Sequence, residues 1–347
     1  MKKKDAPESM YRRDFIKASA AAVGGSAFLA HSTAGQPPLN PPLIRRNEQP
    51  TMTYRKLGRT NFMSSRLVFG CGAALMGGKS TRLLDRAFEA GINHYDIGSD
   101  AYYRGAERQL APFMKEHRDD IWVASKAIVA PARIEPGSEV TREQAVAAAQ
   151  FWTRLLDGSL RDLDTEYVDA YYLMAVEHPT LVRSEELYQA FLDAKAAGKV
   201  GHFGLSAHKN TAAVLEAAIE TGWYDSAMVG ITPVGWYDWV AGDIEEDTPT
   251  LIDLQPLLTR AREAGIGLIG MKTARYLAPM GSAGKGDSTA FDHIYDDTFT
   301  DSHLSPFQRS IAYVLEHGLD VVNADMQNFA HFEENVVAAA TSQDYFG

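Results

Sequence analysis

The sequence predicts a (β/α)8 barrel preceded by a short β-hairpin, and three observations support this prediction. Short apolar runs alternate with amphipathic segments through residues 66–340, giving eight strand–helix units, the pattern of a parallel sheet covered by helices. Most predicted helices end in a glycine turn, as at Gly91, Gly198 and Gly265, because glycine readily takes the left-handed conformation there. An open doubly wound sheet would need an early Gly-x-Gly-x-x-Gly turn, and the glycines of residues 70–78 do not match it.

The elements of the barrel are expected in a regular order. Residues 53–63 place Leu57-Gly58-Arg59-Thr60 between two short extended runs, which predicts the hairpin. The eight strands are expected at residues 66–71, 92–97, 121–128, 167–176, 200–206, 226–232, 266–273 and 319–325. The eight helices are expected at residues 81–90, 106–116, 141–163, 184–197, 211–221, 252–264, 306–316 and 332–340.

Composition limits the classes of function. The chain has 347 residues, of which 45% are hydrophobic, and a net charge of -11, so it can bury one large core. The acidic balance argues against a nucleic-acid partner, because binding phosphates requires clustered Lys and Arg. The single cysteine, Cys71, excludes an intrachain disulfide and a cysteine-based metal site. We expect no metal, because no His, Asp and Glu cluster shows ligand spacing.

Residues 1–34 predict a twin-arginine export signal. Three lysines are followed by Arg12-Arg13-Asp14-Phe15-Ile16-Lys17, a weakly apolar run at 18–30, and the cleavage pattern Ser32-Thr33-Ala34. That run is too short to span a bilayer, so no stable membrane anchor is expected. We therefore expect the twin-arginine translocation machinery as a partner and a periplasmic or otherwise exported location. Residues 35–52 are proline-rich and predict a linker, which leaves residues 53–347 for the barrel.

The second predicted strand ends in an acid. Side chains alternate along a strand, so His94, Asp96 and Gly98 share one face. An acid at the carboxyl end of an inward-facing row is where barrel enzymes hold catalytic groups. An aspartate can also cap the loop that follows through backbone hydrogen bonds. This stretch alone leaves both interpretations open.

Over nearly the whole predicted barrel the chain resembles the aldo-keto reductases. The resemblance is carried by seven pieces in the family's order, namely residues 54–60, 90–96, 105–108, 123–126, 167–173, 198–206 and 332–335. It implies a TIM barrel of aldo-keto reductase type that transfers hydride between NAD or NADP and a carbonyl, using an Asp, a Tyr, a Lys and a His. The acid maps to Asp96 and the lysine to Lys126. The family's spacing puts the tyrosine at Ala101, so Tyr102 is expected to replace it, with Tyr103 as the alternative.

The expected proton chemistry is physically reasonable. A phenol with a reference pKa of ~10 is a poor proton donor at neutral pH. We expect the ammonium of Lys126, held by the Asp96 carboxylate, to lower the pKa of the tyrosine. The family's histidine, however, falls on Met174, whose thioether donates no hydrogen bond. His178 lies in a loop and His202 lies deep in its strand, where a hydrogen-bonded core histidine is the simpler interpretation.

The resemblance also implies a cofactor site. Its expected members are Ser206, Lys272, Arg275, Asp325, Glu334 and Asn335. Lys272 and Arg275, near the end of the seventh strand, are candidates for the pyrophosphate. Asp325 lies where the family holds an adenosine phosphate, and an acid there repels a 2′-phosphate and suits a free ribose, which favours NAD over NADP. The family's Gln on the sixth strand falls on Met228, and the Asn after Ser206 falls on Ala207.

Two loops at the predicted barrel mouth have alternative interpretations. Trp236 and Trp239 follow the sixth strand and, together with Met174, are candidates for a substrate wall. The two tryptophans can equally pack their loop onto the rim. Residues 275–303 form a long Gly-, Ser- and Asp-rich stretch, a length that favours a function such as closing over a cofactor.

Three hypotheses follow for the function. The first is an exported aldo-keto-reductase-like oxidoreductase acting on a small-molecule carbonyl, alcohol or sugar. The second is a non-catalytic protein that binds a small molecule, for example a carbohydrate, on the same barrel, which Met174 and Met228 favour. The third uses Lys126 as a Schiff-base nucleophile, against which its pairing with an acid counts, because a paired lysine is protonated.

Overall fold

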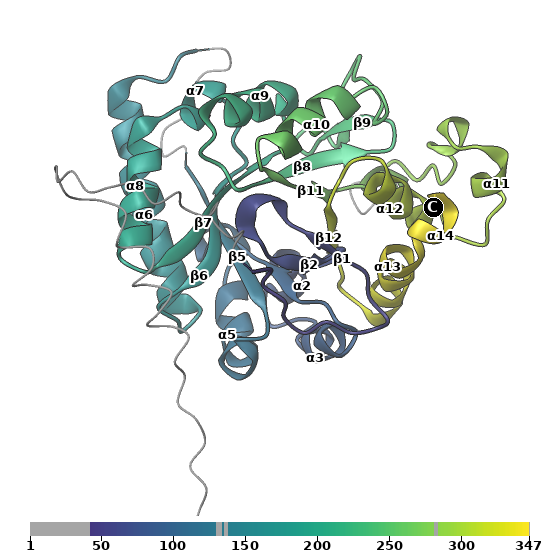
Figure 1. The fold of residues 1–347 in the computed structure, drawn as a ribbon, viewed down its shortest axis with the longest axis horizontal. Helices are drawn as coiled ribbons and strands as arrows, with labels where there is room; N and C mark the ends of the chain where they lie inside the picture. The colour runs from purple at the N-terminus through teal and green to yellow at the C-terminus, as the bar shows by residue number, and fades with distance from the viewer. Residues whose placement is uncertain (1–41, 130–133, 135–137, 281–283, 347) are drawn as a thin grey trace, which may run out of the picture. The chain divides into compact units, whose positions relative to one another are not determined.

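Eight parallel strands close into a barrel in the computed structural model, which describes residues 42–129, 134, 138–280 and 284–346. The strands are β3 (Leu67–Gly70), β4 (His94–Asp96), β5 (Trp122–Ile128), β6 (Val168–Met174), β7 (Val200–Ala207), β8 (Ser226–Thr232), β11 (Gly267–Met271) and β12 (Val321–Asp325). Their order is β8-β11-β12-β3-β4-β5-β6-β7, and β7 pairs back onto β8. The predicted fold class is therefore confirmed, and Figure 1 shows the helices around the strands. The expected export signal at residues 1–34 lies outside the described residues.

A helix follows each barrel strand close to its expected position. These helices are α3 (Arg82–Glu89), α5 (Ala106–His117), α6 (Arg142–Asp162), α8 (Glu185–Ala196), α9 (Thr211–Thr221), α10 (Gln255–Glu263), α12 (Pro306–Glu316) and α13 (Phe329–Thr341). Capping boxes begin two of them, with Thr141 bonding Gln144 before α6 and Ser305 bonding Gln308 before α12. Short helical turns add α2 (Cys71–Leu75), α4 (Asp100–Tyr103), α7 (Pro179–Val182), α11 (Asp297–Thr300), α14 (Gln343–Phe346), η2 (Gly58–Thr60), η3 (Arg275–Leu277) and η5 (Asp292–Ile294).

Alternation of side chains along each strand creates an inner and an outer core. The inner core lies inside the barrel and comprises Leu57, Phe62, Val68, Trp122, Ala124, Ala170, Tyr172, Met228, Ile269, Met271 and Val321. The outer core lies between strands and helices, and includes Phe69, Tyr95 and Phe203. Asp96 and Lys126 fall on the inward rows, because each is an even number of residues from an inward-facing neighbour on its strand.

A hairpin of β1 (Tyr54–Lys56) and β2 (Met63–Ser65) closes the amino end of the barrel. Its turn inserts Leu57 and Phe62, both fully buried, and the Phe62 ring stacks on Trp122 with centroids 4.7 Å apart. Gly58 has φ +49°, and a Cβ there would collide with the backbone of Gly267. Only glycine fits this turn, so the hairpin expected from residues 53–63 also serves as the floor of the barrel.

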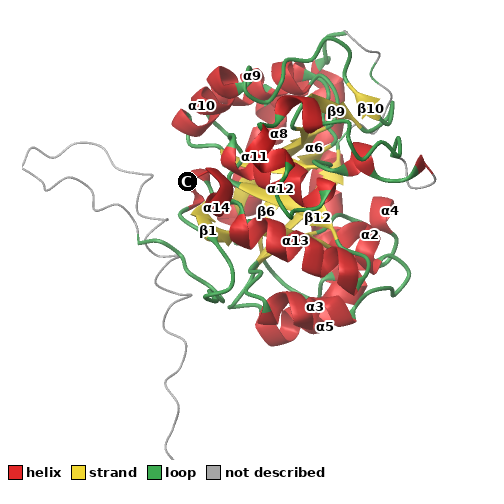
Figure 2. Ribbon diagram, turned by 90° about the vertical axis from the view of Figure 1, so that its right-hand side faces the viewer, coloured by secondary structure: helices red, strands yellow, loops and turns green. Residues whose placement is uncertain are grey.

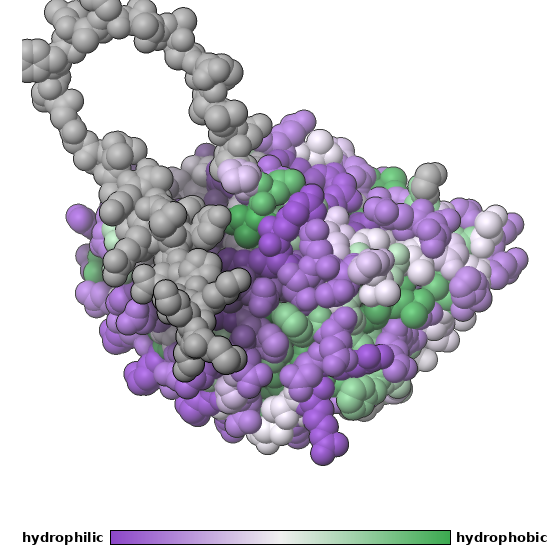
Figure 3. Space-filling view, turned by 60° about the horizontal axis from the view of Figure 1, so that its bottom comes forward, coloured by the Kyte–Doolittle hydropathy of each residue, from purple (hydrophilic) through white to green (hydrophobic). Residues whose placement is uncertain are grey.

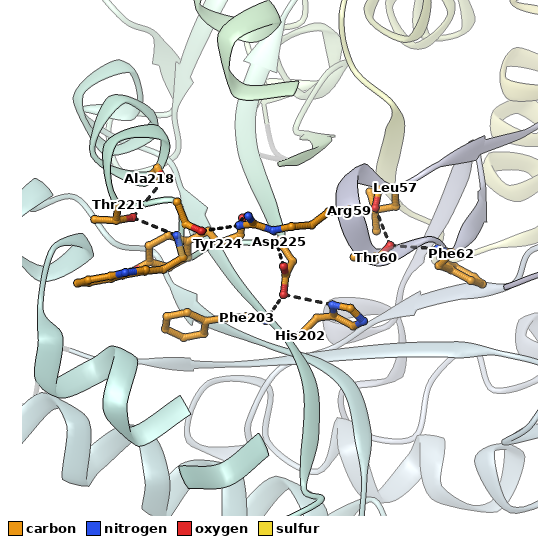
Figure 4. Close-up of polar contacts among 12 residues, drawn as sticks. Leu57, Arg59, Thr60, Phe62, His202, Phe203, Ala218, Thr221, Tyr224 and Asp225 are labelled. Atoms are coloured by element: carbon orange, nitrogen blue, oxygen red, sulfur yellow. Dashed lines mark hydrogen bonds and ion pairs between the residues drawn. The ribbon is translucent and has the colours of Figure 1, made fainter. Parts of the chain in front are cut away.

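Figure 4 shows how a charged network fastens the hairpin to the barrel. Arg59 Nε lies 2.7 Å from Asp225 Oδ1, and His202 Nδ1 lies 3.1 Å from Asp225 Oδ2. Burial would raise the pKa of Asp225, but the His202 hydrogen bond and charge, the Phe203 amide and Arg59 together lower it. His202 also packs on Trp122, with ring centroids 5.1 Å apart. Its contacts therefore stabilise the hairpin end of the barrel, away from the carboxyl ends of the strands.

Residues 42–52, which belong to the linker expected at residues 35–52, pack against the barrel. Ile44 forms a β-bridge with Phe62 and packs against the inner core. Arg46 donates to Asp169 Oδ1 at 3.0 Å and to the carbonyl of Ile121 at 2.6 Å. Composition predicted a linker because the stretch is rich in proline, but Ile44 and Arg46, together with the buried Met52, attach it to the barrel.

The carboxyl ends of the strands form the opposite end of the molecule. Figure 2 shows β9 (Gly235–Asp238), β10 (Asp243–Ile244), α2 and α4 on the side away from β1. The aromatic loop expected after the sixth strand contains this β9–β10 hairpin, which pairs with β8. Hydrophilic residues predominate on the face seen in Figure 3, where hydrophobic ones form small patches. Within the described residues no helix is both long and apolar enough to cross a membrane.

Candidate active site

A buried ion pair stands at the carboxyl ends of β4 and β5. Lys126 Nζ donates to Asp96 Oδ2, and each side chain is only 5% exposed. Asn323 Nδ2, from β12, donates to the same oxygen at 2.7 Å. Asn323 reaches it because Gly70 has no side chain, and a Cβ there would lie 2.7 Å from Asn323 Oδ1. The sequence interpretation did not include Asn323, although it shares the inward row of Asp325 two residues later.

Burial and the neighbouring groups shift the pKa of Asp96 in opposite directions. Burial raises the pKa of Asp96, while the charge and hydrogen bond of Lys126 and the amide of Asn323 oppose that rise. The second oxygen, Asp96 Oδ1, is buried and has no hydrogen-bond partner among the described residues. A buried acceptor without a partner is unusual in a folded protein, so the site has an unused hydrogen-bonding position.

Of the two candidate tyrosines, the structure brings Tyr103 rather than Tyr102 to the pair. Lys126 Nζ lies 5.8 Å from the centroid of the Tyr103 ring. The ring occupies a slot between two glycines, because a Cβ on Gly72 would overlap it and one on Gly98 would lie 2.9 Å from it. Tyr102 is 42% exposed. Both residues belong to the helical turn α4, where consecutive side chains point about 100° apart.

The pKa of Tyr103 is raised, contrary to the lowering expected from a neighbouring ammonium. Burial is the main cause, and the charge of Asp96 adds to it. The slot between the glycines removes the phenol from water, and this burial disfavours the charged phenolate. Tyr103 therefore keeps its proton over the physiological pH range, and in the described structure it is a weaker acid than a free phenol, although it can still donate a hydrogen bond.

A second cluster surrounds Trp239 on the loop after β8. Lys272 Nζ lies 4.1 Å from the centroid of a Trp239 ring, and Arg275 Cζ lies 5.2 Å from it. Lys272 has φ 63°, so the chain turns sharply just after β11. Burial and the charge of Arg275 lower the pKa of Lys272 to about 8, against the opposing charge of Asp325.

Asp325 lies at the carboxyl end of β12. One oxygen accepts from Gln327 Nε2 at 2.7 Å. The other oxygen is buried and, within the described part of the chain, has no partner. The same holds for Arg275 Nε, so the two groups offer one acceptor and one donor.

Three other inward positions on these strands carry two thioethers and a hydroxyl. Met174 ends β6 and is 4% exposed. Met228 lies in the inner core, with its Sδ 3.4 Å from Asn323 Nδ2. Ser206 Oγ accepts from the backbone amide of Ala175 at 3.0 Å, so this hydroxyl holds the end of β6 in place and still has its own hydrogen to donate.

Three other expected site residues are not joined to the pair by any contact among the described residues. Trp236 is 2% exposed and packs in the outer core, which matches the packing interpretation of the aromatic loop rather than a substrate wall. Glu334 accepts a hydrogen bond from the capping hydroxyl of Ser305. Asn335 is 8% exposed on α13. Periodicity places residues on a strand or helix but does not show that a side chain already has a partner.

The long loop after β11 is anchored across the mouth. Lys285 Nζ forms an ion pair with Asp243 Oδ2 at 2.7 Å, which links this loop to β10. Arg309 Nη2, on α12, lies 3.0 Å from Asp292 Oδ1 in η5. Residues 281–283 of the loop after β11 are outside the described part of the chain. Across the described residues no group of three or more His, Cys, Asp or Glu side chains could hold a metal ion.

Comparison with known proteins assigns the fold to a family. The model of the aldo/keto reductase family matches residues 70–273. An uncharacterized oxidoreductase of Bacillus subtilis, YqkF, is 30% identical over 159 residues, which are 45% of this chain and 49% of that protein. The chain thus matches about half the length of this relative.

Two solved structures share the fold at low identity. One is a Pseudomonas aeruginosa protein assigned to the aldo-keto reductases, with a TM-score of 0.58 and 20% identity over 86% of this chain and 99% of that chain. The other is the holo form of an aldo-keto reductase from Bacillus halodurans, with a TM-score of 0.59 and 22% identity over 83% of this chain and 90% of that chain. The family model covers more than half of the sequence, so the chain belongs to the aldo/keto reductase family.

Proposed function

We propose that this protein is an exported oxidoreductase that transfers hydride between a nicotinamide cofactor and the carbonyl or alcohol group of a small molecule. The observation that carries the proposal is the buried Asp96–Lys126 pair with the Tyr103 ring beside it, at the carboxyl ends of the barrel strands. Barrel enzymes place their chemistry at this end. Membership of the aldo/keto reductase family supports a nicotinamide-dependent oxidoreductase.

Each side chain has a distinct part in the proposed reduction. When bound, a nicotinamide would supply the hydride that the carbonyl carbon takes up. Tyr103 gives its phenolic proton to the carbonyl oxygen, so carbon gains the hydride, oxygen gains the proton and an alcohol results. The ammonium of Lys126 then lies beside the phenolate that remains and stabilises its charge. Asp96 holds that ammonium in place, and Asn323 orients Asp96 through their 2.7 Å hydrogen bond.

The mouth offers groups that fit a nicotinamide dinucleotide. Lys272 and Arg275 place two cations beside one another at Trp239, and a pyrophosphate would relieve their mutual repulsion. The partnerless Oδ1 of Asp325 is an acceptor for a ribose hydroxyl. A carboxylate there repels a 2′-phosphate, so we propose NAD as the preferred cofactor. An Asp325→Ser variant should then bind NADPH more tightly than the wild-type protein does, with NADH binding less affected.

One alternative rests on a specific observation. Met174 and Met228 occupy the positions where the family resemblance implies a histidine and a glutamine, and thioethers cannot replace their hydrogen bonds. A barrel without those groups could bind a small molecule, for example a carbohydrate, without transforming it. The retained Asp96, Lys126 and Tyr103 favour the enzyme.

A turnover assay separates the two. The purified protein is mixed with NADH or NADPH and a panel of aldehydes, ketones and sugars, and absorbance at the reduced nicotinamide band is followed. The oxidoreductase proposal requires turnover of at least one compound, which Tyr103→Phe should slow strongly without loss of cofactor binding. Cofactor or sugar binding with no turnover across the panel would favour the alternative, and turnover unaffected by Tyr103→Phe would remove the assigned acid.

Export is a separate part of the proposal and rests on the sequence of residues 1–34. Replacing both Arg12 and Arg13 with Lys should retain the protein in the cytoplasm, because twin-arginine transport depends on that pair. Fractionation of cells carrying either form measures this directly. Equal periplasmic amounts of both forms would contradict the assigned route.

A further inference from the structure

The inward row of β7 begins near His202 and, continued past the end of the strand, reaches a second histidine, His208. His202, Gly204 and Ser206 alternate along that row, and the next inward position is His208, directly after the strand ends at Ala207. His202 is bonded to Asp225 at the amino end. His208 therefore lies at the carboxyl end, the end that holds Asp96 and Lys126.

His208 is next to the strand that ends in Met174. Strands β6 and β7 pair in parallel with Leu173 opposite Leu205, which sets Met174 level with Ser206. The hydrogen bond from the Ala175 amide to Ser206 Oγ ties the two strand ends together. His208 is one inward step beyond that level, on the strand beside Met174.

The surroundings of His208 connect it to both clusters of the mouth. Its ring centroid lies 6.5 Å from that of Trp239, the ring that Lys272 and Arg275 contact. Its Nδ1 atom is buried without a hydrogen-bond partner in the described part of the chain. The charges of Lys272, Lys126 and Asp238 act on the pKa of its imidazole.

His208 stays neutral at working pH. Burial lowers the pKa of His208 to about 3, and the charges of Lys272 and Lys126 act in the same direction. A neutral imidazole has one N–H donor and one acceptor nitrogen. It can therefore donate a hydrogen bond to a carbonyl oxygen without competing with Tyr103 as the source of the proton.

The other histidines near the barrel interior differ from His208 in their position, and His94 Nε2 is a second buried ring nitrogen without a partner among the described residues. His94 Nδ1 lies 3.0 Å from Ser64 Oγ in the floor of the barrel. His178 occupies the residue before α7 without a capping side-chain hydrogen bond, and its Nε2 lies 3.8 Å from Glu177 Oε1. With His202 bonded to Asp225, His208 is, among the described residues, the inward-row histidine at the carboxyl end that has a buried ring nitrogen without a hydrogen-bond partner.

We propose that His208 is a catalytic residue that donates a hydrogen bond to the substrate carbonyl oxygen, a role that the side chain at position 174 cannot fill. The inference rests on the proposed function and adds the group that orients the carbonyl for Tyr103. A donor aimed where negative charge develops stabilises the transition state more than the bound substrate. Its loss should therefore reduce kcat more than it weakens binding.

The test compares three replacements on 4-nitrobenzaldehyde with the cofactor that the wild-type protein binds. His208→Leu removes both nitrogens, and kcat should fall about 10²- to 10³-fold, the usual effect of removing one such donor. His208→Asn keeps an N–H donor and should recover much of that loss. Adding Met174→His to His208→Leu should also restore activity, because it returns an imidazole to the neighbouring strand. His303→Leu, at an exposed histidine bonded to Tyr345, is the matched control.

Cofactor affinity, measured by fluorescence titration, is the second readout. The proposal expects cofactor affinity to change less than about twofold in all three variants. It expects kcat to be low in His208→Leu and higher in the two variants that keep or regain an N–H donor. Unchanged kcat in His208→Leu, or equal losses in His208→Leu and His208→Asn, would overturn the proposal and leave only a packing role against Trp239. Failure of the wild-type protein to reduce this or any panel carbonyl would instead contradict the proposed function, and the inference with it.

Discussion

Removing either member of the Asp96–Lys126 pair should destabilise the fold far more than breaking a surface pair. Both side chains are 5% exposed, and loss of one partner from such a pair typically costs about 3–5 kcal/mol. Asp96→Asn leaves an ammonium buried without its anion. Lys126→Met leaves a carboxylate that can take up a proton, so its cost should be the smaller of the two.

The matched control is Arg183–Glu220, whose 2.6 Å contact is made by side chains that are 41% and 58% exposed. Its removal should cost less than about 1 kcal/mol, because exposed ion pairs contribute little. Urea unfolding followed by circular dichroism gives the free energy of unfolding for each single and double variant. We expect a coupling energy of about 2–3 kcal/mol for Asp96 and Lys126, the upper part of the range for contacting residues. A value below about 0.5 kcal/mol would refute the interpretation of a strongly coupled buried pair.

The sign of the pH dependence gives a further check on this pair. Burial raises the folded-state pKa of Asp96 and Lys126 opposes that rise. In Lys126→Met the pKa should therefore rise further above its unfolded value. The stability linked to a raised carboxyl pKa is present at acid pH and lost as pH rises through that pKa. The cost of Lys126→Met should accordingly be small near pH ~4 and grow towards pH ~7. A cost that does not change with pH would contradict this assignment.

Three other predictions can be tested independently. Tyr103→Phe should lower kcat about 10²- to 10⁴-fold while Tyr102→Phe changes it little, in a steady-state assay that also reports KM; the reverse order would restore Tyr102 as the acid. Cofactor binding should weaken as pH rises through about 8, where Lys272 loses its proton, and a flat titration between pH ~7 and ~9 would remove Lys272 from the phosphate site. Asp225→Asn should cost about 1.5–3 kcal/mol at neutral pH, and because the pKa of Asp225 is lowered, that cost should disappear as pH falls below ~4 in urea unfolding.

Much of the fold could be predicted because the barrel has a strict period. Alternation along strands is enough to put Asp96 and Lys126 on inward rows at the carboxyl ends, and glycine turns mark the helix ends. The same rule applied one step further would have identified Asn323, two residues before Asp325, and His208, two residues after Ser206. Those residues were missed because family spacing, rather than parity, guided the choice of candidates.

The rest depended on contacts that sequence patterns do not contain. Tyr102 and Tyr103 are adjacent, and only the slot between Gly72 and Gly98 shows which ring turns inward. The raised pKa of Tyr103 follows from that slot too, since burial is decided by neighbours from other strands. Trp236 was a reasonable wall candidate until the outer core was seen to bury it.

Titration of the purified protein with NADH and NADPH tests the central claim most directly. Trp239 lies beside Lys272 and Arg275, so a dinucleotide bound there should quench tryptophan fluorescence and excite nicotinamide emission. We predict saturable binding, tighter for NADH than for NADPH, and loss of most of the transfer in Trp239→Phe. If circular dichroism shows a folded protein and neither dinucleotide binds, the claim that this protein is a nicotinamide-dependent oxidoreductase is contradicted.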